Sequence, residues 1–248
     1  MSSPNAALVS KFPAINSTVF GIDISRYQQK IDWDAVAASG VQFCFIKATE
    51  GARDVDGSFK PHWDAAEASG VIRGAYHFFR PQIPPSKQAD LFLSTLGDLQ
   101  TGDLPPALDL EGTAGWVDIP LADRVPMAVK MLEAIENRLH VTPVVYMSPW
   151  FATEMLKSEP ALARFPIWIA QYTEAQTPTV PKPWTTWTFW QYSQGGRVPG
   201  IPGFLDLDRF QGSLGDLKRL TLGANALMVE PAAVTPSEGN ISPAPSVP

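Results

Sequence analysis

Short apolar runs alternate with amphipathic stretches along most of the chain. Turn residues bound the apolar runs, which have the length and composition of β-strands. The predicted strands cover residues 19–25, 45–48, 71–78, 107–111, 144–147, 166–172, 188–192 and 204–208. Helical spacing of apolar residues predicts helices over residues 31–38, 58–69, 86–99, 123–139, 148–157 and 214–222.

This alternation of strands and helices predicts an α/β fold, an irregular (β/α) barrel similar to a TIM barrel. Residues 173–187 are rich in Pro and Thr, so we expect helices to be missing from the last crossovers. The composition divides the chain into an N-terminal extension (1–18), a barrel (19–222) and a tail or linker rich in Pro, Ala and Ser (223–248).

Composition narrows the possible partners. The net charge of −6 without clustered Lys and Arg argues against a nucleic-acid partner. Cys44 is the single cysteine and lies in an apolar run, so we expect a buried side chain and no disulfide. Residues 1–18 do not resemble a secretory signal, and no apolar span is long enough for membrane insertion. We expect a monomer that reaches its site of action after lysis, by phage release or by non-classical export.

The stretch 104–112 carries the first candidate chemistry. Asp109 and Glu111 alternate with Leu108 and Leu110, so in a strand both carboxylates face the same side. The flanking Pro and Gly residues place them at the carboxyl end of the strand, where parallel α/β folds hold their active sites. Two solvated acids at a strand end would give the same pattern, so Asp-x-Glu alone is a weak signal.

Other strand ends carry similar chemistry. Asp23 and Asp206 lie at strand ends that a barrel brings to the same mouth as Asp109. Aromatic residues lie there too, and acids beside aromatic faces are typical of a carbohydrate site. The aromatic candidates are Tyr76, Tyr146, Trp168, Tyr172, Trp190 and Tyr192.

Seven motifs extend this pattern over residues 19–210, in order along the chain. They are Gly21–Ser25, Phe45–Gly51, Gly74–Phe78, Leu108–Glu111, Trp168–Tyr172, Trp190–Tyr192 and Leu205–Asp208. With these motifs the sequence resembles the glycoside hydrolase family 25 muramidases, the Chalaropsis-type lysozymes. The resemblance implies an irregular β/α barrel that hydrolyses the β-1,4 bond from N-acetylmuramic acid to N-acetylglucosamine in bacterial peptidoglycan.

The resemblance also implies roles for individual residues. By position, Glu111 resembles the general acid, Asp109 its partner carboxylate, and Asp23 and Asp206 the sugar-facing acids. Asp208 lies where the family often has Asn, and we expect Asp206 to be the inner acid of the two. The implied substrate-binding residues are Asp23, Asp206, Tyr76, Tyr146, Trp168, Tyr172, Trp190 and Gln191.

The required chemistry agrees with these roles. A leaving glycosidic oxygen needs a proton, and we expect the neighbouring Asp109 to raise the pKa of Glu111. The partner carboxylate steadies an oxocarbenium-like centre or orients the substrate's acetamido group. Residues two apart in a strand are about 6.6 Å apart at Cα, which leaves retaining, inverting and substrate-assisted mechanisms open.

Several alternatives remain at this stage. Lys47 and Glu50 are expected to form a structural ion pair, and the three His lack metal-ligand spacing, so no metal or other cofactor is predicted. A chitinase-like or glucosaminidase barrel is a second enzyme class, although Pro105, Pro106 and Ala107 replace the acidic run expected there. A non-catalytic sugar-binding barrel is the third possibility.

Overall fold

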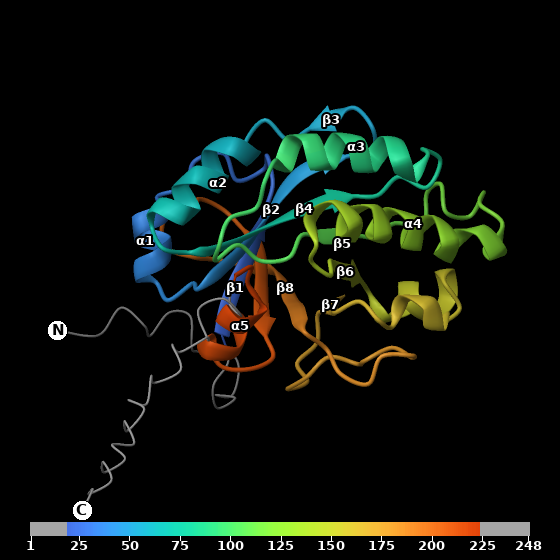
Figure 1. Ribbon diagram of the computed structural model, residues 1–248. Helices are drawn as coiled ribbons and strands as arrows, with labels where there is room; N and C mark the ends of the chain where they lie inside the picture. Colours follow the sequence, from blue (N-terminus) through green and yellow to red (C-terminus); the bar gives the residue numbers. More distant parts are fainter. Residues whose placement is uncertain (1–18, 224–248) are drawn as a thin grey trace, which may run out of the picture.

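Eight strands close into a barrel in the computed structural model, which describes residues 19–223 (Figure 1). The strand order is β1-β9-β8-β7-β6-β5-β4-β2, and parallel pairing of β1 with β2 closes the ring. This confirms the predicted barrel, whereas the predicted extension 1–18 and the predicted tail 223–248, apart from residue 223, lie outside the described residues. The strands are β1 (Val19–Ile24), β2 (Phe43–Glu50), β3 (Asp54–Val55), β4 (Ile72–Phe78), β5 (Ala107–Asp109), β6 (Val144–Met147), β7 (Ile167–Ala170), β8 (Phe189–Gly196) and β9 (Leu205–Phe210).

Helices cover only the first crossovers, as predicted, and the segment from β7 to β8 is loop (Figure 1). The predicted helix over 148–157 is present as helical residues 149–155, but most of it, Phe151–Met155, is a π-helical turn instead of an α-helix. Lys157 and Ser158 adopt positive φ values of 52° and 55° directly after it, which ends the helical path. No helix within residues 19–223 is long and apolar enough to cross a membrane. The α-helices are α1 (Trp33–Ala38), α2 (Phe59–Ala68), α3 (Pro85–Leu96), α4 (Leu121–Leu139) and α5 (Leu214–Leu220).

Strand β9 runs against its neighbours, unlike the strands of a regular (β/α) barrel. It pairs antiparallel with both β1 and β8. Its first residues therefore lie at the same mouth as the last residues of the parallel strands. In this register Asp206 stands opposite Asp23, and Asp208 lies one step deeper, opposite Gly21.

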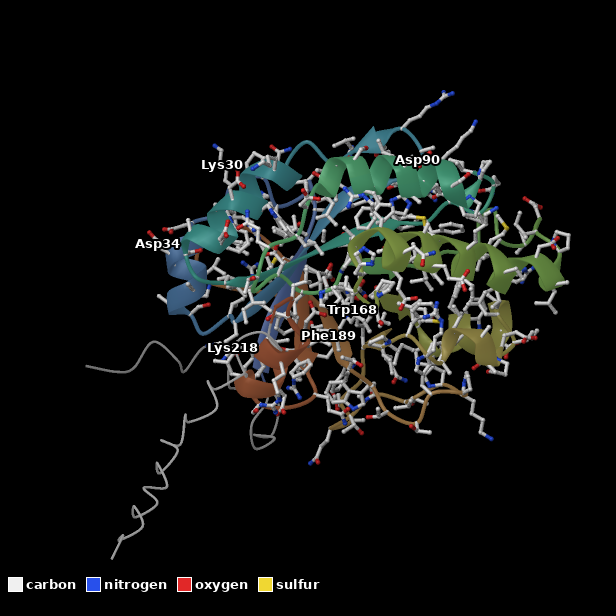
Figure 2. The ribbon with its side chains drawn as sticks, viewed as in Figure 1. Lys30, Asp34, Asp90, Trp168, Phe189 and Lys218 are labelled. Carbon is white, nitrogen blue, oxygen red and sulfur yellow. The ribbon has the colours of Figure 1, made fainter. Side chains whose placement is uncertain are left out.

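Two apolar layers hold the barrel together. The outer layer lies between helices and strands, where α4 contributes a buried stripe from Val125 to Ile135. Cys44 belongs to this outer layer and is buried, as predicted. The inner layer fills the barrel with aromatic rings, and Figure 2 shows Trp168 and Phe189 near the middle of the molecule. Leu217 of α5 joins this inner layer.

The inner layer requires glycine where a ring crosses a neighbouring strand. A Cβ atom on Gly21 would lie 2.3 Å from the Phe43 ring. We expect Gly21→Ala to lower the free energy of unfolding by about 1–3 kcal/mol, because the ring has to shift within a packed interior. Chemical denaturation measures the effect, and Gly57→Ala is the control because its Cβ would meet no atom within 4 Å. Equal effects of the two substitutions would contradict the prediction.

Candidate active site

A cavity of about 250 Å³ opens at the mouth of the barrel. It is lined by most of the site residues predicted from the sequence and by one that was not predicted, Gln194. Trp190 is the predicted site residue that does not line it. The lining residues are Asp23, Tyr76, Asp109, Glu111, Tyr146, Trp168, Tyr172, Gln191, Gln194 and Asp206.

The two candidate catalytic acids reach the cavity from the end of β5. The backbone N–H of Leu110 donates to the carbonyl of Tyr146 at 2.9 Å, so pairing with β6 continues past the end of the strand. Leu108 and Leu110 pack in the outer core, and Asp109 and Glu111 face the cavity. Asp109 is only 5% exposed, whereas Glu111 keeps contact with solvent at the mouth.

Both acids hold their protons to a higher pH than isolated carboxyl groups. Burial raises the pKa of Asp109 well above its ordinary value, and the charge of Glu111 raises it further. Partial burial between the cavity walls also raises the pKa of Glu111, with a smaller contribution from Glu50. We expected Asp109 to raise the pKa of Glu111, but loss of water around the carboxyl group is the main cause.

Cations oppose these shifts from the side of β2 and β4. Lys47 Nζ donates to Glu50 Oε2 at 2.6 Å, which confirms the predicted ion pair, and Arg80 Nε donates to Glu50 Oε1 at 2.8 Å. Lys47 and Arg80 lower the pKa of both Asp109 and Glu111. A β-bulge between Lys47 and Thr49 shifts the register of β2 and lets residues three apart pair on one face.

Buried His77 anchors the loop that carries Arg80. Gln88 Nε2 donates to the carbonyls of Arg80 and Ile83 at 2.9 and 2.8 Å, so its Oε1 is an acceptor. His77 Nε2 lies 3.0 Å from that oxygen and therefore donates to it, while Nδ1 lies 2.7 Å from Thr49 Oγ1. Burial lowers the pKa of His77 to about 4, so the ring is neutral at pH 7.

Gln191 organises the opposite wall of the cavity. The hydroxyls of Tyr146 and Tyr172 donate to its Oε1 at 2.9 and 2.8 Å. Its Nε2 donates to Asp23 Oδ2 at 2.7 Å. These three bonds set the orientation of the amide and connect strands β1, β6 and β8. The resemblance implied Gln191 as a substrate-binding residue, and the structure shows that its amide also holds Asp23 in place.

A third buried acid lies beneath the cavity. Asp208 is fully buried and accepts a hydrogen bond from Trp168 Nε1 at 2.8 Å. Burial raises its pKa to about 8. Burial, followed by the charges of Asp208 and Asp206, raises the pKa of Asp23 well above its ordinary value, and Asp23 hydrogen-bonds Asp208. Burial and then Glu111 raise the pKa of Asp206 to about 6.

The two β9 acids lie at different depths. We expected Asp206 to be the acid that points into the site, and Asp206 lines the cavity, whereas Asp208 faces the same way but is buried beneath it. Because β9 is antiparallel, its earlier residue, Asp206, lies nearer the mouth. Asp208 was not among the predicted site residues, although period two already placed it on the same face as Asp206.

Three of the aromatic candidates lie in three different environments. Trp168 is 2% exposed and stacks on Phe45 with ring centroids 4.5 Å apart, and it forms part of the cavity floor. Tyr172 is 49% exposed at the rim and is free to contact a sugar. Trp190 is 1% exposed in the outer core, where its Nε1 donates to the carbonyl of Gln171 at 2.8 Å. The prediction that Trp190 binds sugar is therefore wrong, since Gln191 faces the cavity and its neighbour must face away.

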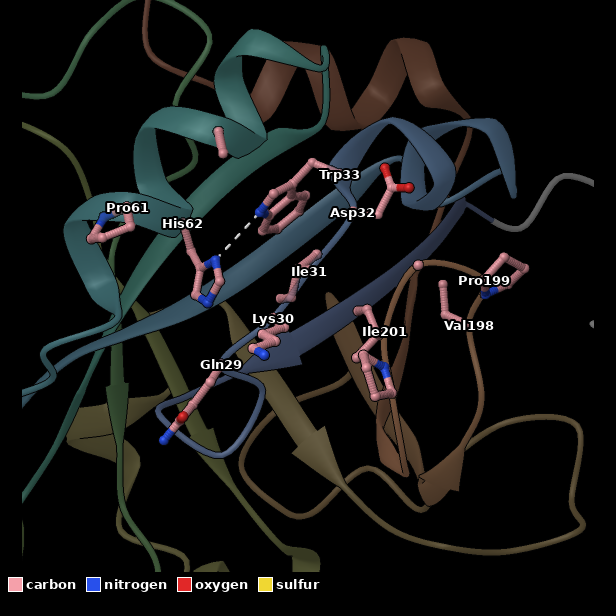
Figure 3. A pocket seen from close by; sticks show the side chains of 13 residues that line it. Gln29, Lys30, Ile31, Asp32, Trp33, Pro61, His62, Val198, Pro199 and Ile201 are labelled. Atoms are coloured by element: carbon pink, nitrogen blue, oxygen red, sulfur yellow. Dashed lines mark hydrogen bonds between the residues drawn. The ribbon is translucent and has the colours of Figure 1, made fainter.

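A larger apolar groove lies between α1, α2 and the loop from β8 to β9 (Figure 3). His62 is the histidine that lines this groove, and both nitrogens of its ring form hydrogen bonds. Trp33 Nε1 donates to Nδ1 at 3.4 Å, and Nε2 lies 2.9 Å from the carbonyl of Gln28. Within residues 19–223, no group of three or more His, Cys, Asp or Glu side chains has the geometry of a metal site.

The buried acids make stability depend on pH. The pKa of Asp208 is about 8 in the folded protein and ordinarily 3.8, so its contribution to stability is full below about pH 4 and is lost toward pH 8. Asp208→Asn removes this titration and keeps an acceptor for Trp168. We expect its free energy of unfolding to fall less between pH 4 and 8 than that of the wild type, as measured by urea denaturation. Asp90→Asn, at an exposed position, is the control, and parallel curves for all three proteins would contradict the prediction.

Comparison with known proteins agrees with this geometry. The sequence profile of glycosyl hydrolases family 25 matches residues 22–201. The chain is 36% identical to lysozyme M1 of Streptomyces globisporus over 220 residues, which are 84% of this chain and 73% of that protein. It is 31% identical to the N,O-diacetylmuramidase of Chalaropsis sp over 218 residues, which are 83% of this chain and 100% of that protein.

Solved structures give the same result. The crystal structure of a lysozyme from Streptomyces coelicolor matches with a TM-score of 0.80 and 34% identity, over 85% of this chain and 100% of that one. The chain belongs to glycosyl hydrolase family 25.

Proposed function

We propose that Glu111 protonates the leaving oxygen when this lysozyme-class glycosidase hydrolyses peptidoglycan, and that Asp109 is its partner carboxylate. The bond cut is the β-1,4 bond from N-acetylmuramic acid to N-acetylglucosamine. The observation that carries the proposal is that both acids line one cavity at the end of β5 with raised pKa values. A carboxyl group that keeps its proton near neutral pH is what a general acid requires.

Access to solvent supports this division of roles. Glu111 is exposed at the mouth, where a glycosidic oxygen in the cavity is within reach of its carboxyl group. Asp109 is buried deeper, and its Oδ1 has no hydrogen-bond partner among the described residues. A positive charge that develops on the sugar would make ionisation of Asp109 easier and would be stabilised by it.

Asp109 has two possible roles once it is ionised. It stabilises an oxocarbenium-like centre directly, or it orients the acetamido group of the substrate as an internal nucleophile. Proton NMR of the first product anomer distinguishes net retention from inversion. Retention without a trapped glycosyl-enzyme would favour the acetamido route.

The bond specificity separates muramidase action from glucosaminidase or chitinase-like action. Mass spectrometry of digested peptidoglycan is expected to show muramic acid at the new reducing ends. Reducing-end glucosamine would assign the chain to the glucosaminidase alternative. A complete absence of products in a wall-turbidity assay would favour the non-catalytic barrel.

Removing the proton donor tests the central assignment. We expect Glu111→Gln to lower wall lysis by about 10²-fold or more, because the amide keeps the shape but has no acidic proton to give. The basic limb of the activity–pH profile, which reports ionisation of Glu111, should be absent in this variant. Glu159→Gln, at an exposed position between β6 and β7, is the control. Near-normal lysis by a folded Glu111→Gln protein would disprove the assignment.

Substitution of Lys47 tests how a nearby positive charge affects the pKa values of the two acids. Its ammonium group lowers the pKa of both Asp109 and Glu111, so Lys47→Met should raise both pKa values. We expect both limbs of the kcat/KM profile to move to higher pH. Lys47→Arg keeps the charge and should restore the wild-type profile. Lower activity without any change in the pH profile would mean that Lys47 has only a structural role.

A further inference from the structure

A second groove of about 910 Å³ lies beside the active site, between the β2–β3 hairpin and the first turns of α3. Glu50 and Arg80 form one end of it. The same two residues, together with Lys47, shift the pKa values of Asp109 and Glu111. The groove is therefore next to the side of the active site that carries Lys47 and Arg80.

The groove carries an excess of unpaired positive charge. Arg53 and Lys87 are exposed on opposite walls, one on the hairpin and one on α3, and neither has an ion-pair partner among the described residues. Two of the three acids along the groove are already paired, Glu50 with Arg80 and Asp54 with Arg26. Asp90 is the remaining carboxylate. The unpaired charges are thus two cations and one anion, which favours an anionic ligand.

The walls of the groove are built before any ligand arrives. Gln88 holds the loop of residues 80–83 through three hydrogen bonds to its backbone, at 2.8 to 2.9 Å. On the other wall, Gly51 has φ of 57°, and its N–H donates to the carbonyl of Phe78 at 3.1 Å. Ile83 and Leu91 add apolar surface between the cations. A preformed groove loses little conformational entropy when it binds an extended segment.

We propose that this groove binds the acidic peptide that peptidoglycan carries on its muramic acid, with Arg53 and Lys87 receiving the peptide carboxylates. The inference rests on the proposed function, because it needs a muramic acid in the neighbouring cavity. A stem of about five residues spans about 17 Å when extended. The end of the groove formed by Glu50 and Arg80 is the end that faces the cavity acids, so a chain attached at the cavity enters the groove there. The apolar side chains of the stem then contact Ile83 and Leu91.

The test compares two forms of one substrate. Soluble, uncrosslinked glycan strands are used with their peptides intact and after an amidase has removed the peptides. We expect wild-type KM to be about five-fold lower for the peptide-bearing strands, with less difference at high salt. Arg53→Glu combined with Lys87→Glu should abolish that difference, because attraction becomes repulsion.

Controls make each outcome decisive. Lys130→Glu combined with Lys218→Glu changes the net charge equally at exposed positions outside the groove and should keep the wild-type preference. Thermal melting checks that both double variants fold. An equal KM of the wild type for both substrates would overturn the proposal, as would the same loss in both double variants. No cleavage of either substrate would instead refute the proposed function.

Discussion

Burial of carboxyl groups inside an aromatic barrel is the constraint on which the rest of the site depends. Ionised carboxylates in such a place are costly unless donors surround them. Asp208 has the indole of Trp168 and a hydrogen bond with Asp23, and Asp23 has the amide of Gln191. The amide is held in turn by the hydroxyls of Tyr146 and Tyr172. The donors limit the cost of charge but do not remove it, so the pKa values stay raised and protons remain in the interior near neutral pH.

Period two explains how much of this could be predicted from the sequence. Alternation placed Asp109 and Glu111 on one face and Leu108 and Leu110 on the other, and the structure agrees because β5 keeps its pairing past its last residue. The same rule should have excluded Trp190. A strand that points Gln191 into the cavity must point its neighbour into the outer core. The error came from weighing the residue type, an aromatic near a strand end, above its position in the alternation.

Local irregularities account for what the sequence could not show. The bulge in β2 brings Lys47 and Glu50 to one face, although strict alternation would separate residues three apart. The register of β8 also shifts after Gln191. Gln194, three residues further on, therefore lines the same cavity as Gln191. The antiparallel direction of β9 places Asp206 at the mouth and Asp208 one step beneath it. Bulges and strand direction depend on partners far along the chain, so no short stretch of sequence encodes them alone.

The mouth of the barrel is electrostatically asymmetric, and the candidate catalytic pair lies at the boundary. On the side of β1 and β9, the charges that act on Asp23, Asp206 and Asp208 are other carboxylates, and they raise pKa values. On the side of β2 and β4, Lys47 and Arg80 lower them. At Asp109 and Glu111, burial is the largest influence and raises both pKa values, Glu50 adds to the rise, and Lys47 and Arg80 oppose it. A proton donor needs a raised pKa, whereas a partner carboxylate has to ionise as positive charge develops on the sugar, and the cations favour that ionisation at Asp109. Burial alone would hold both protons, and Lys47 and Arg80 make ionisation easier. The bulge after Lys47, which brings Glu50 to the face of Lys47, is therefore as much a part of the acid–base site as the strand that carries the acids.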